Sequence, residues 1–383
     1  MYFHIFKLTA IFATLMASIY IHIPFCKQRC SYCDFFSSTE SPKKEKYVDS
    51  LCEELIERKD YLQETVETVY FGGGTPSLLS AADFEKIFNT IFHIYGENDK
   101  REITLEANPD DIKSEYLDSI KHLPFNRISL GIQSFDDKEL QLLNRRHDAQ
   151  SAIQAVERLQ KAGYNNISID LIYGLPEQKI DTWHKTLCNS INLQVQHISA
   201  YHLTYEEGTP LYEQMHEGKL IPVDEELSNS FFNLLIDTLT ASGFEHYEIS
   251  NFARSGFHSK HNISYWNGTN YLGVGASAHS YNGTSRQWNK KTLSPDYWTS
   301  GCEIETLDEK MKYNDFVITR LRRLIGIDIN ELIFLFGESK KKYCLQQAEK
   351  YIADKQLCYI DNCLRLTRKG IFISDGIIRD LML

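Results

Sequence analysis

Short apolar runs alternate with longer amphipathic stretches over the first half of the chain. Runs rich in β-branched and aromatic residues predict six strands, at residues 19–23, 68–71, 102–106, 127–133, 167–172 and 197–203. Between these runs, apolar residues recur at helical spacing. Strand–helix units in succession predict an α/β fold, in which a parallel sheet is curved into a partial (β/α)6 barrel.

Two helix starts are visible in this half of the chain. Ser41 followed by Pro42 is an N-cap with proline at the first helical position, and it predicts a helix that runs to about Leu62. Ser80 and Asp83 form a capping-box pattern. The aromatic stripe that follows Asp83 is expected to pack into the core.

The alternation fades after Tyr205, where a helix at 224–241 and a stretch rich in Gly, Asn and aromatic residues at 245–288 follow. The tail from 307 is largely helical, with a hairpin expected at 357–359 and 364–366. We therefore expect four parts, which are an N-terminal extension at 1–17, the barrel at 18–240, a connecting segment at 241–306, and a small α+β domain of winged-helix-like order at 307–383.

The apolar residues 5–17 have two interpretations. They resemble a targeting segment, but they include Lys7 and are too few to cross a bilayer. A start codon placed before the natural one, with Met16 as the natural start, is the interpretation we favour.

Charge and cysteine content narrow the functional classes. A formal net charge of −11 argues against a general nucleic-acid binder. Six of the nine cysteines are scattered without the spacing of a disulfide scaffold, which is typical of a reducing cytosol. We therefore expect a cytoplasmic protein with no nucleic-acid partner.

The other three cysteines, Cys26, Cys30 and Cys33, have the spacing C-x3-C-x2-C directly after the first predicted strand. Three thiolates bind three irons of a 4Fe-4S cluster and leave the fourth iron open to a small molecule. Zinc is the alternative, but a zinc site usually needs four ligands in two pairs, and we find no second pair.

Polar residues and glycines follow the other predicted strands at their carboxyl ends. In parallel sheets, catalytic and binding residues are usually found at these ends. Glycines let a ligand approach the backbone closely, and carboxylates hold hydroxyl or amino groups. A tight turn or an exposed strand-end charge is the structural alternative for each. These residues are Gly72, Gly73, Gly74, Thr75, Glu106, Gln133 and Asp170, with Arg145 in a following stretch.

A second candidate site is the run His261-Asn-Ile-Ser-Tyr265-Trp266. A neutral imidazole can bind heme iron, and aromatic rings can stack on a porphyrin. A hydrogen-bonded core histidine is the structural alternative. His258, His279 and Cys302 remain open as other heme ligands.

Taken together, these motifs resemble the oxygen-independent coproporphyrinogen III oxidase family of radical S-adenosylmethionine (SAM) proteins, from about residue 20 to the C-terminus. The resemblance implies a radical SAM partial barrel in which Cys26, Cys30 and Cys33 bind a 4Fe-4S cluster. It also implies SAM-contacting positions, which are Tyr20, Tyr32, Gly73, Gly74, Thr75, Glu106, Gln133, Arg145 and Asp170.

Two features resemble the heme-chaperone branch of that family, the HemW type. Phe35 stands where the decarboxylases carry a further cysteine, and His261-Asn-x-x-Tyr-Trp looks like the branch signature. The resemblance implies heme as a ligand, with His261 as the heme candidate, and transfer of heme to acceptor proteins. Membrane-bound respiratory enzymes are among the acceptors considered, with peripheral membrane association as a consequence.

Other functions stay open from the sequence. A coproporphyrinogen III oxidase would decarboxylate its substrate to protoporphyrinogen IX, with a 5′-deoxyadenosyl radical from SAM. Another radical SAM enzyme, acting on RNA or a peptide, is the third interpretation, and the acidic charge argues against RNA.

Overall fold

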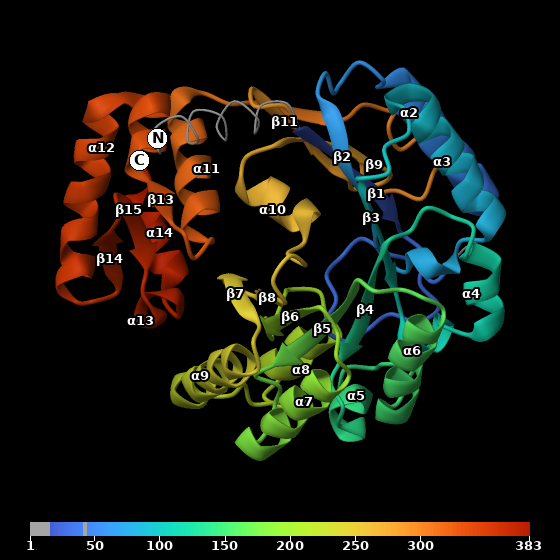
Figure 1. The fold of residues 1–383 in the computed structure, drawn as a ribbon, viewed down its shortest axis with the longest axis horizontal. Coiled ribbons are helices and arrows are strands. Elements are labelled where there is room, and N and C mark those ends of the chain that lie inside the picture. The colour runs from blue at the N-terminus through green and yellow to red at the C-terminus, as the bar shows by residue number, and fades with distance from the viewer. Residues whose placement is uncertain (1–15, 41–43) are drawn as a thin grey trace.

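The computed structural model describes residues 16–40 and 44–383, and a twisted sheet dominates it (Figure 1). Within those residues the main sheet has the order β12-β11-β10-β9-β1-β2-β3-β4-β5-β6-β8-β7. Its first six strands in the chain are parallel neighbours. They are β1 (Met16–Ile23), β2 (Thr65–Gly73), β3 (Glu102–Ala107), β4 (Arg127–Gln133), β5 (Ile167–Tyr173) and β6 (His197–His202).

These strands confirm the six that the apolar runs predict, and their bounds differ by a few residues at the ends. The difference is largest in β2, which runs from Thr65 to Gly73. β1 begins earlier than predicted, at Met16, which pairs with Thr65 of β2. Met16 and Ala17, which we assigned to an N-terminal extension, therefore belong to the sheet. The rest of that expected extension, residues 1–15, lies outside the described residues.

Helices cover the outer side of the parallel strands (Figure 1). They are α2 (Lys44–Glu57), α3 (Ala81–Tyr95), α4 (Ser114–Ile120), α5 (Asp137–Leu142), α6 (Ala149–Lys161), α7 (Ile180–Asn192), α8 (Pro210–His216) and α9 (Glu225–Ala241). The capping box of α3 is confirmed, with Ser80 and Asp83 bonded reciprocally. The expected cap at Ser41 and Pro42 lies outside the described residues, and α2 ends at Glu57, before Leu62.

Aromatic side chains fill the space between β2 and α3. Phe71, Phe84, Phe88 and Phe125 meet edge to face, with ring centroids 5.0–5.5 Å apart. Edge-to-face contacts add to the free energy gained by burying the rings. The stripe on α3 is therefore core, as the sequence predicts.

The segment 241–306, which the sequence predicts to be a connector, supplies strands to the same sheet. β9 (Asn270–Val274) pairs parallel to β1, and β10 (His279–Tyr281), β11 (Ser285–Trp288) and β12 (Glu303–Thr306) continue that edge. β7 (Glu245–Glu248) and β8 (Asn251–Ala253) extend the β6 edge.

The apolar pattern does not predict β9, because Gly273 interrupts the apolar run of this strand. A Cβ at Gly273 would lie 2.0 Å from the carbonyl oxygen of His279, so the close approach of β9 and β10 requires glycine there. Between the two edges of the parallel strands lies α10 (Lys260–Trp266), which faces the barrel interior (Figure 1). Ser264 of α10 bonds to Ser18 of β1 at 2.8 Å.

The C-terminal part is a small α+β domain, as the sequence predicts. It contains α11 (Glu309–Leu321), α12 (Ile329–Ala353), α13 (Arg368–Ile371) and α14 (Ser374–Leu381), with β13 (Ile327–Asp328), β14 (Leu357–Ile360) and β15 (Cys363–Leu366). Asp361 and Asn362 have φ of 52° and 61°, which suits the tight turn of the predicted hairpin. Backbone bonds from Ile249 N to Arg322 O and from Leu324 N to Tyr247 O join this domain to β7.

The aromatic core generates a stability prediction. Phe84→Ala should lower the free energy of unfolding by about 3–5 kcal/mol, because it removes a fully buried ring and leaves a cavity. Phe334→Ala is the matched control, since that ring is 85% exposed, and it should change stability by less than about 0.5 kcal/mol. Urea unfolding followed by circular dichroism measures both, and equal effects would contradict the core assignment.

Candidate functional site

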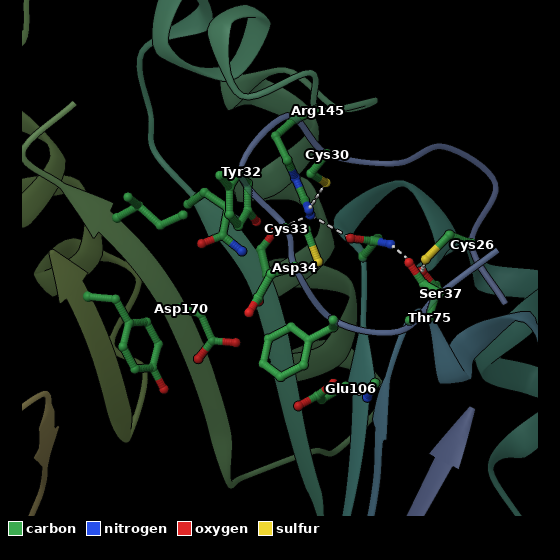
Figure 2. A pocket seen from close by; sticks show the side chains of 18 of the residues that line it. Cys26, Cys30, Tyr32, Cys33, Asp34, Ser37, Thr75, Glu106, Arg145 and Asp170 are labelled. Carbon is green, nitrogen blue, oxygen red and sulfur yellow. Dashed lines mark hydrogen bonds between the residues drawn. The ribbon is translucent and has the colours of Figure 1, made fainter. Parts of the chain in front are cut away.

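Three thiols line one cavity at the carboxyl ends of the parallel strands (Figure 2). Cys26, Cys30 and Cys33 lie in the loop after β1, and all three are free and partly buried. Two backbone bonds tie the ends of this loop together, from Cys26 N to Ser38 O at 2.9 Å and from Ser38 N to Pro24 O at 2.7 Å. The loop is therefore held as one unit that presents its sulfurs to the cavity.

The three thiols fit the ligand set of an iron–sulfur cube better than that of a single metal ion. Each cysteine of a cube binds a different iron, so the three sulfurs surround a volume and need not converge on one point. Among the described residues, no three His, Cys, Asp or Glu side chains converge on a single-ion site. Burial raises the pKa of Cys33 to about 11, so binding of a cluster must release protons from the thiols.

A hydrogen-bond network connects two of the thiols, and dashed lines in Figure 2 follow it. Arg145 donates to Cys30 Sγ at 3.1 Å and also to Asn108 Oδ1 and Gly131 O. Asn108 Nδ2 donates to Thr75 Oγ1 at 3.1 Å, and that hydroxyl lies 3.6 Å from Cys26 Sγ. We call these residues, Arg145, Asn108 and Thr75, the thiol network.

The glycine run after β2 lies against the cysteine loop. A Cβ at Gly74 would meet Phe25 O at 2.8 Å and Cys26 Sγ at 3.0 Å, and Gly73 has a φ of +110°. Glycine is therefore required at both positions. The backbone N–H groups of both glycines are engaged within the protein, because Gly73 N donates to Glu106 Oε2 at 3.1 Å and Gly74 N to Ile23 O at 2.8 Å.

Two carboxyl groups line the same cavity. Glu106 on β3 accepts a bond from the Tyr70 hydroxyl at 2.6 Å, and Asp170 on β5 lies 3.4 Å from the Ser129 hydroxyl. Burial raises the pKa of Glu106 to about 7 and raises that of Asp170 as well. Glu106 therefore exchanges its proton near neutral pH, which suits a group that binds amino or hydroxyl groups.

The remaining predicted positions divide between two parts of the interior. Tyr32 and Gln133 line the cavity at the cysteine loop, which has a volume of about 630 Å³ and which we call the outer cavity. Gln133 has a φ of 70° where the register between β4 and β5 shifts. Tyr20 lines a second cavity of about 310 Å³ that also contains α10 residues, and we call it the inner cavity.

His261 also lines the inner cavity, from α10. Its side chain is buried, and its backbone N–H donates to Glu102 at 3.0 Å. Nδ1 lies 2.7 Å from the Thr68 hydroxyl and Nε2 lies 3.0 Å from the Tyr265 hydroxyl. Burial lowers the pKa of His261 to about 3, so the imidazole is neutral, as a metal ligand must be. The ring is thus both a bonded core histidine and a wall of the cavity.

The other three heme-ligand candidates line neither the inner nor the outer cavity. His258 lies 2.9 Å from Glu245, and His279 stacks on Trp288 with centroids 5.8 Å apart. Cys302 lines a separate cleft beside Tyr61 and Trp298. Of the four candidates, His261 alone belongs to the interior that contains the thiols.

The sequence prediction missed two interior residues, Tyr70 and Arg127, and it assigned no separate role to Asn108 at the end of the third strand. Asn108 follows directly after the strand that carries Glu106. Tyr70 and Arg127 are in the period-two series of inward positions on their strands, Tyr70 with Thr68 and Arg127 with Ser129. The alternation of a strand between apolar core and barrel interior would have identified both.

Models of two protein families match this chain. The model of the Radical SAM superfamily matches residues 20–187, and the model of the HemN C-terminal domain matches residues 307–373. In a solved structure, coproporphyrinogen III oxidase (HemN) from Escherichia coli has the same fold, with a TM-score of 0.81, 22% identity, and coverage of 99% of this chain and 92% of that one.

Curated relatives match over nearly the whole chain. The protein named heme chaperone HemW of Lactococcus lactis is 33% identical over 372 residues, which cover 96% of this chain and 97% of that protein. Radical S-adenosyl methionine domain-containing protein 1, mitochondrial, of Mus musculus is 36% identical over 411 residues, which cover 97% of this chain and 88% of that protein.

The buried carboxyl of Glu106 generates a prediction about pH. Folding raises the pKa of Glu106 from 4.5 to about 7, so the wild type loses the stability that this group contributes as pH rises through that range. Glu106→Gln cannot ionise, so its thermal midpoint relative to the wild type should increase from about pH 4.5 to about pH 8. Glu115→Gln, at an exposed position, is the control, and a difference independent of pH would contradict the assignment.

Proposed function

The chain belongs to the HemW family of radical SAM proteins, and from this we propose that it is a heme chaperone that binds heme and passes it to acceptor proteins. The observation that supports this proposal most is that the thiols of the cysteine loop and the side chain of His261 lie in one interior of the barrel. The thiols of the cysteine loop line the outer cavity, and the neutral imidazole of His261 lines the inner cavity. The two cavities have six lining residues in common, which are Phe35, Gly73, Glu106, Ser129, Asp170 and Tyr201.

Cys26, Cys30 and Cys33 would hold a 4Fe-4S cluster, and the three thiols facing one cavity fit such a cluster. When bound, the cluster would supply one open iron, which the amino and carboxylate groups of SAM would chelate. The thiol network donates to Cys30 and approaches Cys26, which orients both sulfurs before the cluster arrives. Donors near a ligating sulfur also tune the cluster, because they stabilise its negative charge.

The SAM-contacting positions would serve different parts of the ligand. The carboxyls of Glu106 and Asp170 and the amide of Gln133 surround the outer cavity, where they can accept bonds from amino and hydroxyl groups. Gly73 and Gly74 leave room for close approach, and Tyr32 presents an aromatic ring. Tyr20 lies in the inner cavity and so would contact SAM only at the boundary between the two cavities.

His261 would bind the heme iron through Nε2. With the Nδ1 proton donated to the Thr68 hydroxyl, the lone pair of Nε2 points at the Tyr265 hydroxyl, which must turn away when iron binds. A bond at the other ring nitrogen that fixes the tautomer is typical of histidine ligands. Tyr70 stacks on the imidazole with centroids 4.8 Å apart, which restricts the ring further.

Two observations favour a chaperone over a decarboxylase. Phe35 occupies the position of a further cysteine in the decarboxylases that this loop resembles, and its ring is 63% exposed. Relatives that align over nearly the whole chain carry the name heme chaperone. The likeness to the E. coli oxidase, at 22% identity, supports the fold alone.

Oxidation of coproporphyrinogen III is the second candidate, because the thiols line a cavity of about 630 Å³, which is within the size range of ligand pockets. Formation of protoporphyrinogen under anaerobic reducing conditions would support it.

The proposed setting is the cytoplasm, with heme-accepting proteins as partners. Membrane-bound respiratory enzymes are among the proposed acceptors. Peripheral association of this protein with the membrane would bring it close to them. No helix in residues 16–40 or 44–383 combines the length and apolar character needed to cross a bilayer.

The thiol assignment predicts the iron content of variants. Cys26→Ala, Cys30→Ala and Cys33→Ala should each lose most of the iron and sulfide bound after anaerobic reconstitution, because each removes one of three cluster ligands. Cys52→Ala removes a buried thiol of α2 and should keep the wild-type content. Iron analysis and the absorbance near 400 nm measure the outcome, and full loading of a Cys33 variant would refute the assignment.

Heme binding predicts a spectroscopic result. Hemin added to the reconstituted protein should bind stoichiometrically with a shifted Soret band, and His261→Ala should weaken this binding by about tenfold or more, because it removes the proposed iron ligand. His279→Ala is the control, since His279 lines neither cavity. Wild-type protein without saturable binding would rule out the chaperone, whereas equal binding by the His261 variant would move the ligand elsewhere.

A further inference from the structure

The inner cavity is built from several elements of the barrel. Strands β1, β2, β3, β4, β5 and β6 line it together with α10. Its volume of about 310 Å³ is at the lower end of the range of ligand pockets, which is about 300–1,000 Å³. The inner cavity shares six lining residues with the outer cavity. It can therefore hold one edge of a large ligand, and the remainder of that ligand would extend toward Phe35 and Tyr201, where the two cavities meet.

Arg127 is the cation of this inner cavity. It is the first residue of β4, it is 2% exposed, and it lines the cavity. Among the described residues, Nε has no hydrogen-bond partner and the guanidinium has no ion pair within 4.0 Å. Its one side-chain partner is Asn166 Oδ1, at 3.4 Å. A guanidinium keeps its charge at every physiological pH, so this is a buried charge with little local compensation.

The surrounding groups respond to that charge. Arg127 helps to lower the pKa of His197 and of His261, whose main cause is burial, and it opposes the rise in the pKa of Asp170. The carboxyl of Asp170 nevertheless bonds to Ser129 rather than to the guanidinium. A buried charge without a counter-ion is costly, so a ligand that brings an anion to this position gains more than it would at the surface.

The planar shape of the guanidinium group indicates which kind of anion it binds best. Guanidinium groups bind carboxylates through two parallel hydrogen bonds, and such pairs are strong where water is excluded. His261 and Arg127 face the same inner cavity from α10 and β4, so a ligand held at its metal by the imidazole can place a carboxylate at the guanidinium. Heme has that combination of iron and peripheral propionates.

We propose that Arg127 binds a propionate carboxylate of the heme, and that this contact selects ionised tetrapyrroles for the inner cavity. The inference rests on the proposed heme-binding function and adds to it a residue that determines specificity. The tyrosines of the inner cavity, Tyr20, Tyr70 and Tyr265, supply hydroxyls and ring faces around the same edge of the ligand.

The test compares hemin with hemin dimethyl ester, in which both propionates are uncharged. Each is titrated into reconstituted wild type, Arg127→Gln and Arg127→Lys, with Arg158→Gln as the matched control. Arg158 is also partly buried and bonds to Ile112 O at 3.1 Å, but it lines neither the inner nor the outer cavity. Thermal melting and iron content report whether each variant folds and holds its cluster.

The wild type and Arg158→Gln should prefer hemin over the ester by about tenfold or more. Arg127→Gln should bind hemin and the ester with the same affinity, which is that of the wild type for the ester. Arg127→Lys should keep part of the preference for hemin, because lysine keeps the positive charge but cannot form two parallel hydrogen bonds to a carboxylate. The preference should persist at about 0.5 M salt, since a buried pair is screened little.

Wild type that binds both compounds equally would overturn the inference without any variant, as would Arg127→Gln that keeps the full preference. Both results leave heme binding intact. Wild type that binds neither compound would instead remove the proposed function, and the inference with it. A preference that disappears at 0.5 M salt in every protein would assign it to surface cations and would also overturn the inference.

Discussion

The partly buried guanidinium of Arg145 holds the candidate site together. One side chain bonds to the thiol of Cys30, to the side chain of Asn108 after β3, and to the backbone of β4 at Gly131. Because Asn108 also bonds to Thr75, the loops after β1, β2 and β3 share one set of bonds. Four segments distant in sequence are thereby fixed relative to one another, which is what a preorganised site for a cluster and its ligand needs.

The C-terminal domain is part of the same construction, because it holds the helix that carries His261. Arg320 of α11 donates to the carbonyls of Trp266 and Asn267 at the C-terminus of α10, and it pairs with Glu331 of α12. At the other end of α10, Glu102 accepts bonds from the backbone N–H groups of Lys260 and His261. Both ends of the helix are therefore fixed, one by the barrel and one by the small domain, and this positions the imidazole in the inner cavity.

Sequence reasoning was most successful where one physical rule decides the outcome. Apolar period and strand length gave β1 to β6, and the rule that parallel strands end on one edge brought Gly73, Glu106, Gln133 and Asp170 to one cavity. It failed where a partner across the fold decides the conformation. The strand β9 contains Gly273, which the close approach of β10 requires, so its apolar run is interrupted. Tyr20 faces the inner cavity because residues that share one face of a strand lie at different heights along it. The network of Asn108 depends on contacts between loops, which no local pattern contains.

The central claim is that the thiols and the heme ligand belong to one interior, and the most direct measurement is a crystal structure of the reconstituted protein with bound hemin, with anomalous data at the iron edge. The account predicts iron density among Cys26, Cys30 and Cys33 and a separate single iron beside His261 Nε2, with a propionate toward Arg127. A heme iron in the cleft of Cys302, or on the outer surface, would contradict it.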